Sequence, residues 1–342
     1  MRKLHIIRYV GLWLLLLTAC NATHQPSSLC YKKRTYPAAL SLDARDSLII
    51  PQPFDLLTWS IRQHTVFFVT AGVEENFLAA YRYPEGEKRF EYGRIGQGPD
   101  EFLTLNVGKG QADCLLLYDI MGRKASLFDT AHDTIRRHDP LSLYNDSEGY
   151  CKPFTDILQI SSDCYLMKID GGESSEWEIA NLKDGKTTGS FRNPCRRQDT
   201  SYTPFDFVQD AIDTTLLVAY KYMDRVECYS IAEEKILPLF FMGSSSDQAD
   251  IKDYDLLEPY YLDITTHDGC FYLLKSDEGK EQGRRIEVYD GEGTCKSVFN
   301  LDKELTSIRF DGEGRLIGYV ADINQTILYR YMTYRRIDEM KD

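Results

Sequence analysis

A short apolar phrase recurs six times along this chain of 342 residues, at intervals of 45 to 55 residues. Each copy begins at a polar residue and continues into a run such as TVFFV or CLLLY. The polar residues that open the copies are His64, Asp113, Asp163, Asp213, Asp268 and Glu313. A second strand-like run ends 15 to 21 residues after each of these, at Tyr81, Phe128, Leu182, Tyr229, Tyr289 and Tyr329.

The stretch 268–300 shows what one repeat contains. Its apolar runs Cys270–Leu274, Ile286–Tyr289 and Cys295–Phe299 are separated by Gly, Asp and Glu, a pattern typical of a small antiparallel meander. One such meander cannot bury both of its faces, whereas a repeat of 40 to 50 residues with four short strands is typical of a β-propeller blade. The sequence therefore predicts an all-β, six-bladed propeller of four-stranded antiparallel blades. We expect part of residues 38–50 to close the ring by pairing with the last blade, because closure removes exposed strand edges.

Composition limits the possible partners. Hydrophobic residues make up 43% of the chain, enough for a large core, and the repeat favours a single domain. The formal net charge is −13 with no basic stripe, whereas nucleic-acid binding requires clustered Lys and Arg. We therefore exclude nucleic acid as a partner.

The first 20 residues have the pattern of a targeting segment. Arg2, Lys3 and Arg8 precede the short apolar run Val10–Leu17, which is about half the roughly 20 residues that a membrane-spanning helix needs. The closing residues Leu-Thr-Ala-Cys resemble the lipobox of bacterial lipoproteins, which implies a lipid on Cys20. The alternative is an ordinary signal peptide with a coincidental cysteine. We expect a signal peptide over 1–19, a lipidated tether over 20–37 and the propeller over 38–342, with its first full blade from about residue 54.

A glycine-rich phrase, GRIGQGPDEF, occupies residues 93–102 between the first two repeats. It resembles the G-x-x-G-x-G-P-x-E-F phrase of six-bladed, NHL-like or TolB-like β-propeller lipoproteins of Gram-negative bacteria, although Asp100 stands where that family often has Gly. The resemblance implies a propeller anchored in the cell envelope, and the missing acidic cluster after Cys20 favours the periplasmic side of the outer membrane. The glycine order is not that of a dinucleotide-binding loop, and the phrase leads into a strand, so we interpret it as a turn between blades.

The longest segments between repeats predict the functional face. They are 93–103, 137–153, 192–204 and 242–259, and in a propeller they emerge on one face. Long loops on a rigid scaffold often carry binding, and the end of the central channel provides a concave site. The candidate ligand-binding residues on this face are Arg94, Tyr150, Arg196, Arg197, Tyr202, Tyr254, Tyr260 and Tyr261. The alternative for each tyrosine is packing beneath its own loop.

Signatures of catalysis and of metal binding are missing from the sequence. The six His are scattered over different segments, with no H-E-x-x-H, and there is no G-x-S-x-G elbow. We predict no cofactor and no metal site. Cys114, Cys164 and Cys270 occupy equivalent repeat positions and are expected to be small core residues, while Cys30, Cys151 and Cys195 are the candidates for any disulfide.

The function we predict is a binding or assembly module of the cell envelope, with a protein, peptide or glycan as its partner and with the membrane contacted through the lipid alone. The alternative is an enzyme of the propeller lyase, lactonase or hydrolase type, with polar residues at the end of the channel.

Overall fold

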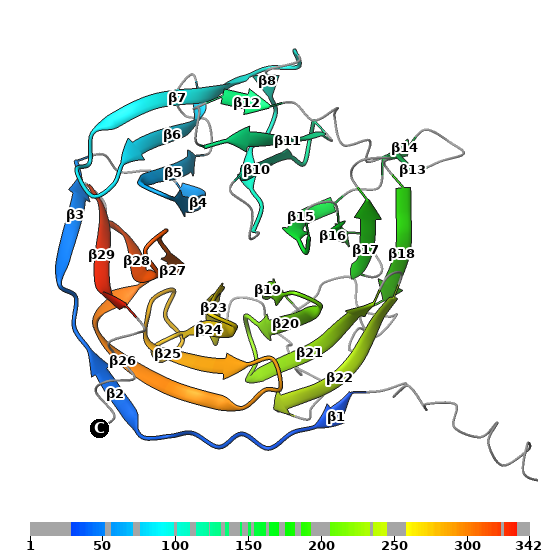
Figure 1. Cartoon of the computed structure of the whole chain (residues 1–342), viewed down its shortest axis with the longest axis vertical. Coiled ribbons are helices and arrows are strands. Elements are labelled where there is room, and N and C mark those ends of the chain that lie inside the picture. Colours follow the sequence, from blue (N-terminus) through cyan, green and yellow to red (C-terminus); the bar gives the residue numbers. More distant parts are fainter. Residues whose placement is uncertain are drawn as a thin grey trace, which may run out of the picture.

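The computed structural model of the chain is all-β, and its sheets stand in a ring around a central channel (Figure 1). It describes residues 29–51, 56–70, 76–98, 101–109, 114–122, 124–130, 134–136, 144–145, 150–151, 154–161, 164–170, 175–181, 186–192, 206–232, 235–244, 258–322 and 325–333. These ranges form strands and turns without a helix, and hence without one that is long and apolar enough to cross a membrane. The predicted six-bladed propeller is confirmed.

Each blade is a sheet whose strands follow one another along the chain from the channel outward. Blade one contains β4 (Leu56–Arg62), β5 (Thr65–Thr70), β6 (Asn76–Arg82), β7 (Lys88–Ile95) and the parallel strand β8 (Glu101–Phe102). Blade two contains β9 (Asn106–Val107), β10 (Cys114–Asp119), β11 (Lys124–Asp129) and β12 (Thr134–Arg136), and is followed by the hairpin β13 (Tyr144–Asn145) and β14 (Tyr150–Cys151). Blade three contains β15 (Phe154–Gln159), β16 (Cys164–Asp170), β17 (Ser175–Asn181) and β18 (Lys186–Arg192).

The second half of the ring repeats this order. Blade four contains β19 (Phe207–Ile212), β20 (Thr215–Tyr220), β21 (Arg225–Ala232) and β22 (Lys235–Gly243). Blade five contains β23 (Tyr261–His267), β24 (Cys270–Lys275), β25 (Gly283–Asp290) and β26 (Cys295–Leu305). Blade six contains β27 (Ser307–Phe310), β28 (Arg315–Asp322) and β29 (Gln325–Thr333).

The N-terminal segment runs around the outside of three blades (Figure 1). Strand β1 (Cys30–Tyr31) pairs in parallel with β22, and β2 (Ala39–Leu42) pairs in parallel with β26. Strand β3 (Asp46–Ile50) pairs antiparallel with β29 and is the fourth strand of blade six, so the predicted closure by residues 38–50 is confirmed. Residues 335–340 lie outside the described part of the chain, and β3 takes the place beside β29.

The core lies between neighbouring blades, and the alternation of side chains along each strand explains why. On β20, Leu216 and Val218 pack in the cluster shared with blade three, whereas Leu217 and Ala219 pack in the cluster shared with blade five. Successive residues of a strand point to opposite faces of the sheet. A second strand that is covered on both faces therefore needs an unbroken apolar run, which is the phrase that recurs in the sequence.

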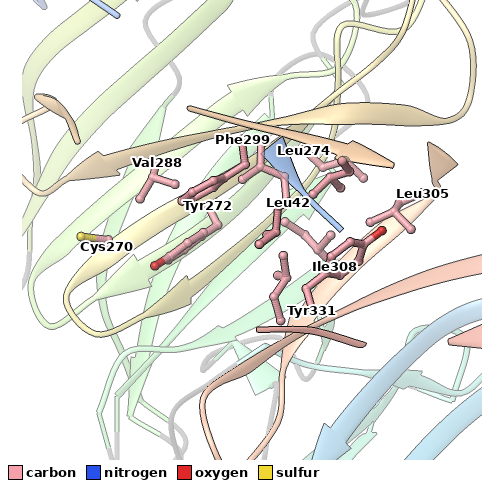
Figure 2. Close-up of a cluster of buried hydrophobic side chains, with 12 residues drawn as sticks. Leu42, Cys270, Tyr272, Leu274, Val288, Phe299, Leu305, Ile308 and Tyr331 are labelled. Carbon is pink, nitrogen blue, oxygen red and sulfur yellow. The ribbon is translucent and has the colours of Figure 1, made fainter. Parts of the chain in front are cut away.

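Figure 2 shows the cluster between blades five and six. Tyr272 and Val288 come from blade five, Ile308 and Tyr331 come from blade six, and Leu42 on β2 packs against both sets. Burying a large apolar side chain stabilises a fold by roughly 1.5–3 kcal/mol. The N-terminal segment therefore contributes side chains to the core as well as backbone pairing to the sheet edges.

The described residues of the glycine-rich phrase contact one another and neighbouring residues of the propeller. Gly93 has a φ of 81°, and a Cβ there would lie 3.2 Å from the side chain of Leu105. The carboxylate of Glu101 accepts a 2.8 Å hydrogen bond from the N–H of Gly98. Phe102 is buried against Tyr92, with ring centroids 5.8 Å apart.

The described side chains of Cys30, Cys164, Cys228 and Cys295 are free thiols. Cys30, one of the three candidates for a disulfide, is exposed on β1. Cys195 lies outside the described residues, and nothing is described of the side chain of Cys151. Cys270 is buried, as expected, whereas Cys114 and Cys164 are partly exposed.

Candidate functional site

The first strands of the blades line the central channel, and a partly open cavity of about 90 Å³ lies between them. These strands contact one another around the ring, and a bridge between Lys109 and Leu158 links blades two and three. Side chains from five blades line the cavity: Trp59, Ser60, Arg62, Val107, Lys109, Asp210, Thr265, Thr266, Arg309 and Phe310, with Gly108. Charged residues on otherwise apolar strands make this cavity the candidate site.

Asp263 on β23 does not line the cavity, but its carboxylate contacts basic side chains that do. Its carboxylate accepts hydrogen bonds from Arg309 Nη1 at 2.5 Å and from Lys109 Nζ at 3.2 Å. The backbone N–H groups of Ile308 and Ile264 donate to it at 3.0 and 2.9 Å. Burial alone would raise the pKa of Asp263, but the attraction of Arg309 and Lys109 outweighs it, and the pKa lies below its ordinary value. Asp263 is therefore a fixed anion that ties three blades together.

Asp210 on β19 has a different environment. It is 6% exposed, and its carboxylate accepts a 2.8 Å hydrogen bond from the N–H of Ala211. Burial raises the pKa of Asp210 to about 6, although Lys109 and Arg309 act in the opposite direction. The pKa values of Asp210 and Asp263 are thus shifted in opposite directions, and such perturbed groups are typical of functional sites.

Arg62, the last residue of β4, completes the charged lining. Its Nη1 donates a 3.1 Å hydrogen bond to the carbonyl oxygen of Ile61. Burial lowers the pKa of Arg62 to about 10, and the repulsion of Arg309 adds to this effect while Asp210 opposes it. The guanidinium remains charged at neutral pH, and the lining of the cavity contains three basic side chains and the carboxyl group of Asp210.

A series of side-chain hydrogen bonds links blades two, three and four. Tyr118 donates to Asp156 Oδ1 at 3.1 Å, and Gln209 donates to the other oxygen at 3.2 Å. Trp177 donates in turn to Gln209 Oε1 at 2.9 Å. Because these side chains are hydrogen-bonded to one another, we interpret them as a structural link between blades beside the cavity.

The direction of the inner strands shows where the cavity lies along the channel. Each inner strand begins after the link from the preceding blade and ends at a short turn to the second strand. Arg62 precedes the turn at Gln63, Thr266 lies one residue before the end of β23, and Phe310 ends β27. The cavity is therefore in the half of the channel nearest these short turns. The sequence predicts a site at the opposite end, where the long links emerge.

Of the predicted ligand-binding residues, those that the structure describes do not line this cavity. Arg94 is exposed at the outer strand β7, and Tyr150 lies on β14, where only its backbone is described. Tyr260 is half-buried and accepts a 2.6 Å hydrogen bond from Lys275, while Tyr261 is fully buried with its ring 5.0 Å from that of Tyr260. The remaining four predicted residues lie outside the described part of the chain: Arg196, Arg197, Tyr202 and Tyr254. A site on the link face stays a prediction.

The cavity residues were missed, although the sequence carries a signal for them. A charged residue interrupts the first strand of several repeats, at Arg62, Asp156, Asp210, Asp263 and Arg309. The first strand of a blade lines the channel, so a charge there points to the interior of the ring rather than to the outer surface. Metal binding has no comparable signal, because the described residues contain no group of three or more His, Cys, Asp or Glu placed to hold an ion.

Two solved structures, both from Bacteroides, support the ring. A member of the DUF4221 family from Bacteroides vulgatus matches with a TM-score of 0.54 and 11% identity, over 85% of this chain and 98% of that chain. A candidate exported protein from Bacteroides fragilis matches with a TM-score of 0.54 and 11% identity, over 90% of this chain and 99% of that chain. Regucalcin, a calcium-binding protein from Agrobacterium tumefaciens, matches with a TM-score of 0.49 and 16% identity, over 86% and 97%.

No family model matches the sequence. No curated protein matches it either. At 11% identity, the first two structures share the propeller fold with this chain, and the fold alone assigns no function.

Proposed function

We propose that this chain is a lipid-anchored propeller of the cell envelope that acts as a binding or assembly module for a protein, a peptide or a glycan. The lipobox at Leu17–Cys20 and the resemblance of the glycine-rich phrase to NHL-like and TolB-like lipoproteins support this proposal. The candidate exported protein among the similar structures is consistent with it. The outer membrane, on its periplasmic side, is the location we propose.

The position of β1 is the observation that carries the proposal. The described chain begins at Leu29, beside Cys30 on the outer edge of blade four, away from the channel (Figure 1). Leu29 lies nine positions after Cys20, and this length of chain can span at most about 30 Å. A lipid on Cys20 would thus hold the ring by its rim, close to the membrane, without covering the ends of the channel.

Metabolic labelling with an alkyne fatty acid tests the anchor. The full chain expressed in a Gram-negative host should take up the label and fractionate with membranes, and Cys20→Ala should abolish both. Cys30→Ala is the matched control, since it removes an exposed cysteine ten residues away and should leave both results unchanged. Equal labelling of the Cys20→Ala variant would refute the anchor. Crosslinking in membranes and a carbohydrate array then distinguish a protein partner from a glycan.

A second candidate function is catalysis in the channel, and Asp210 is the observation that favours it. A buried carboxyl group whose pKa is raised to about 6 is suited to general acid or base chemistry. Turnover of a lactone, an ester or a uronate polymer that Asp210→Asn abolishes would support an enzyme. Turnover that survives this substitution would exclude Asp210 as the catalytic group.

A further inference from the structure

Aromatic and basic side chains gather on the outer rim of blade four, where β1 is the outermost described strand. Tyr31 on β1 is 61% exposed, and its ring lies 5.4 Å from that of Phe241, its partner on β22. The Nζ of Lys32 lies 5.1 Å from the ring centre of Phe240, and Lys33 is exposed. We call these residues the rim patch. Exposed apolar side chains that gather in one place are typical of a contact with a protein or with a membrane.

The backbone around the rim patch is fixed to the ring. The N–H of Lys32 donates a 2.8 Å hydrogen bond to the carbonyl oxygen of Phe241, which continues the pairing of β1 with β22. The ammonium group of Lys32 donates to the carbonyl oxygen of Glu292, in the turn of blade five. The rim patch therefore spans the outer edges of two blades, and little conformational entropy is lost when it makes a contact.

The position of the rim patch indicates a bilayer as its partner. Leu29, the first described residue, lies nine positions after Cys20, so a lipid on Cys20 keeps the patch within about 30 Å of the membrane. A second contact made by a tethered molecule is an intramolecular step with a high effective concentration. Even a weak contact between the rim patch and the membrane would therefore be populated.

The residue types of the rim patch match a bilayer surface. Tyrosine is enriched at membrane–water interfaces, because its ring is apolar and its hydroxyl group can stay among the lipid headgroups. Lysine combines an apolar stem with an ammonium group that is attracted to anionic lipids. Arg34 follows in the sequence, but its guanidinium is paired with Asp224, and we do not count it in the patch.

We propose that the rim patch lies on the phospholipid surface of the membrane that holds the anchor. Tyr31 enters the headgroup region, and Lys33 lies at the lipid phosphates. This inference rests on the lipid anchor proposed above and adds an orientation to it. With the rim on the membrane, the channel axis lies along the membrane plane, and both ends of the channel remain open to partners (Figure 1).

Site-specific photo-crosslinking in membranes tests the contact. The full chain carries benzoylphenylalanine in place of Tyr31 or of Ile95, in a Gram-negative host whose phospholipids are radiolabelled in their phosphate. Ile95 is the matched control, since it is 51% exposed on β7 of blade one, across the ring from blade four (Figure 1). Light should attach labelled phospholipid at position 31 and leave position 95 at the level of an unirradiated sample. A diacylglyceryl group on Cys20 contains no phosphate and does not contribute to this signal.

A charge reversal tests the role of the basic side chain. Lys33→Glu, in the chain with the probe at position 31, should lower the phospholipid adduct by roughly fivefold or more, because a cation near an anionic bilayer strengthens binding by about that factor. Lys88→Glu is the control, since Lys88 is an exposed lysine on β7 of blade one and should not affect the adduct. Equal losses in the two variants would indicate a general attraction of the chain to the membrane and would overturn the rim contact.

Fatty-acid labelling of Cys20 in the same membranes separates this inference from the anchor. A labelled chain that gives no phospholipid adduct at position 31, or equal adducts at positions 31 and 95, overturns the rim contact and leaves the anchor standing. An adduct with a protein in place of phospholipid at position 31 also overturns it and makes the rim patch a protein interface. An adduct with phospholipid on an unlabelled chain supports the contact and refutes the anchor, whereas an unlabelled chain without an adduct overturns both.

Discussion

Tyr289 donates a hydrogen bond of 2.8 Å to the carboxylate of Glu287, which lies two positions before it on β25. Residues two apart on a strand share a face, so the pair lies between two sheets, and both side chains are fully buried. Tyr229 and Glu227 repeat this pair on β21 of blade four, at 2.6 Å. The Glu-x-Tyr pattern is therefore a structural element of the third strands of blades four and five.

Removing the carboxylate of Glu287 should destabilise the ring. Glu287 also accepts 3.4 Å hydrogen bonds from Tyr261 and from Tyr36, and its carboxylate lies 3.3 Å from Arg285. Glu287→Ala leaves the buried hydroxyl groups of Tyr289 and Tyr261 without this acceptor, and we expect the free energy of unfolding to fall by about 3–5 kcal/mol. Urea unfolding followed by circular dichroism measures the loss. Glu304→Ala, the same change at an exposed ion pair, should leave the midpoint where it is, and equal losses in the two variants would contradict this account.

Two neighbouring isoleucines on β3 test the closure of the ring. Ile50 is 2% exposed and packs with blade one, whereas Ile49 is 53% exposed on the opposite face of the strand. Ile50→Ala should lower the free energy of unfolding by about 2–4 kcal/mol, because it leaves a cavity between blades six and one. Ile49→Ala should change it by less than about 0.5 kcal/mol. Similar losses for both would mean that β3 does not hold this register in solution.

Arg34 should hold the N-terminal segment against blade four. Its side chain is 7% exposed, forms an ion pair with Asp224 and donates a 3.3 Å hydrogen bond to the carbonyl oxygen of Met242. We expect Arg34→Ala to destabilise the fold by about 2 kcal/mol and to speed hydrogen exchange over residues 30–42. The exposed neighbour Lys33 provides the control, since Lys33→Ala should leave exchange in this segment unchanged. Faster exchange spread evenly over all blades would instead indicate global destabilisation.

The second strands explain why the fold was predictable from the sequence. Leu216 and Leu217 are both fully buried, because β20 is covered by a blade on each side. A strand in that position must be apolar at every residue, so each blade leaves a visible run in the sequence. The short turns add a second signal, as at Asp268 and Gly269, which have φ angles of 47° and 71° and occupy a region favoured by few residue types. Blade number and order follow from these local patterns.

The path of the N-terminal segment was only partly predictable. Closure by β3 follows from the general need to cover a sheet edge, but the pairing of Cys30 with Phe240 joins residues about 200 positions apart. The parallel strands β1 and β2 depend on edges that exist only after blades four and five have formed. Nothing local in the residues 30–42 indicates those partners, and we expected a tether over part of this stretch.

The cavity residues were not predicted from the sequence, for a similar reason. Loop length identifies where variable surface emerges, whereas the charged residues that line the cavity, Arg62, Lys109, Asp210 and Arg309, come one each from four different blades. Lys109 and Asp263 are 154 positions apart, and their 3.2 Å contact exists only because the ring closes. Tyr261, one of the aromatic residues predicted to bind a ligand, is buried in the core between blades four and five.

The carboxyl groups of Asp210 and Asp263 should change the free energy of unfolding with pH in opposite directions. The two changes should fall in different pH ranges. The pKa of Asp210 is raised from 3.8 to about 6 by burial, so the folded state binds its proton more tightly than the unfolded state does. The stabilisation from this proton is fully present below about pH 4 and is lost as the pH rises to about 6. Asp263 has a lowered pKa, so its contribution is present above pH 4 and is lost in more acidic solution. The charged groups that face Asp210 are Arg62, Lys109, Arg309 and Asp263.

Asp210→Asn separates this effect from every other titration in the chain. The amide keeps the oxygen that accepts the N–H of Ala211 and carries no charge, so the variant should be about 2 kcal/mol more stable than the parent at pH 7 and equally stable at pH 4. Urea unfolding of the two proteins at half-unit pH steps gives the difference directly. Asp156→Asn is the matched control, because Asp156 accepts hydrogen bonds from Tyr118 and Gln209 in the neighbouring polar chain. Relative to the parent, Asp156→Asn should not gain stability as the pH rises from 4 to 7. If the difference in stability between Asp210→Asn and the parent stayed constant over this range, Asp210 would not titrate there.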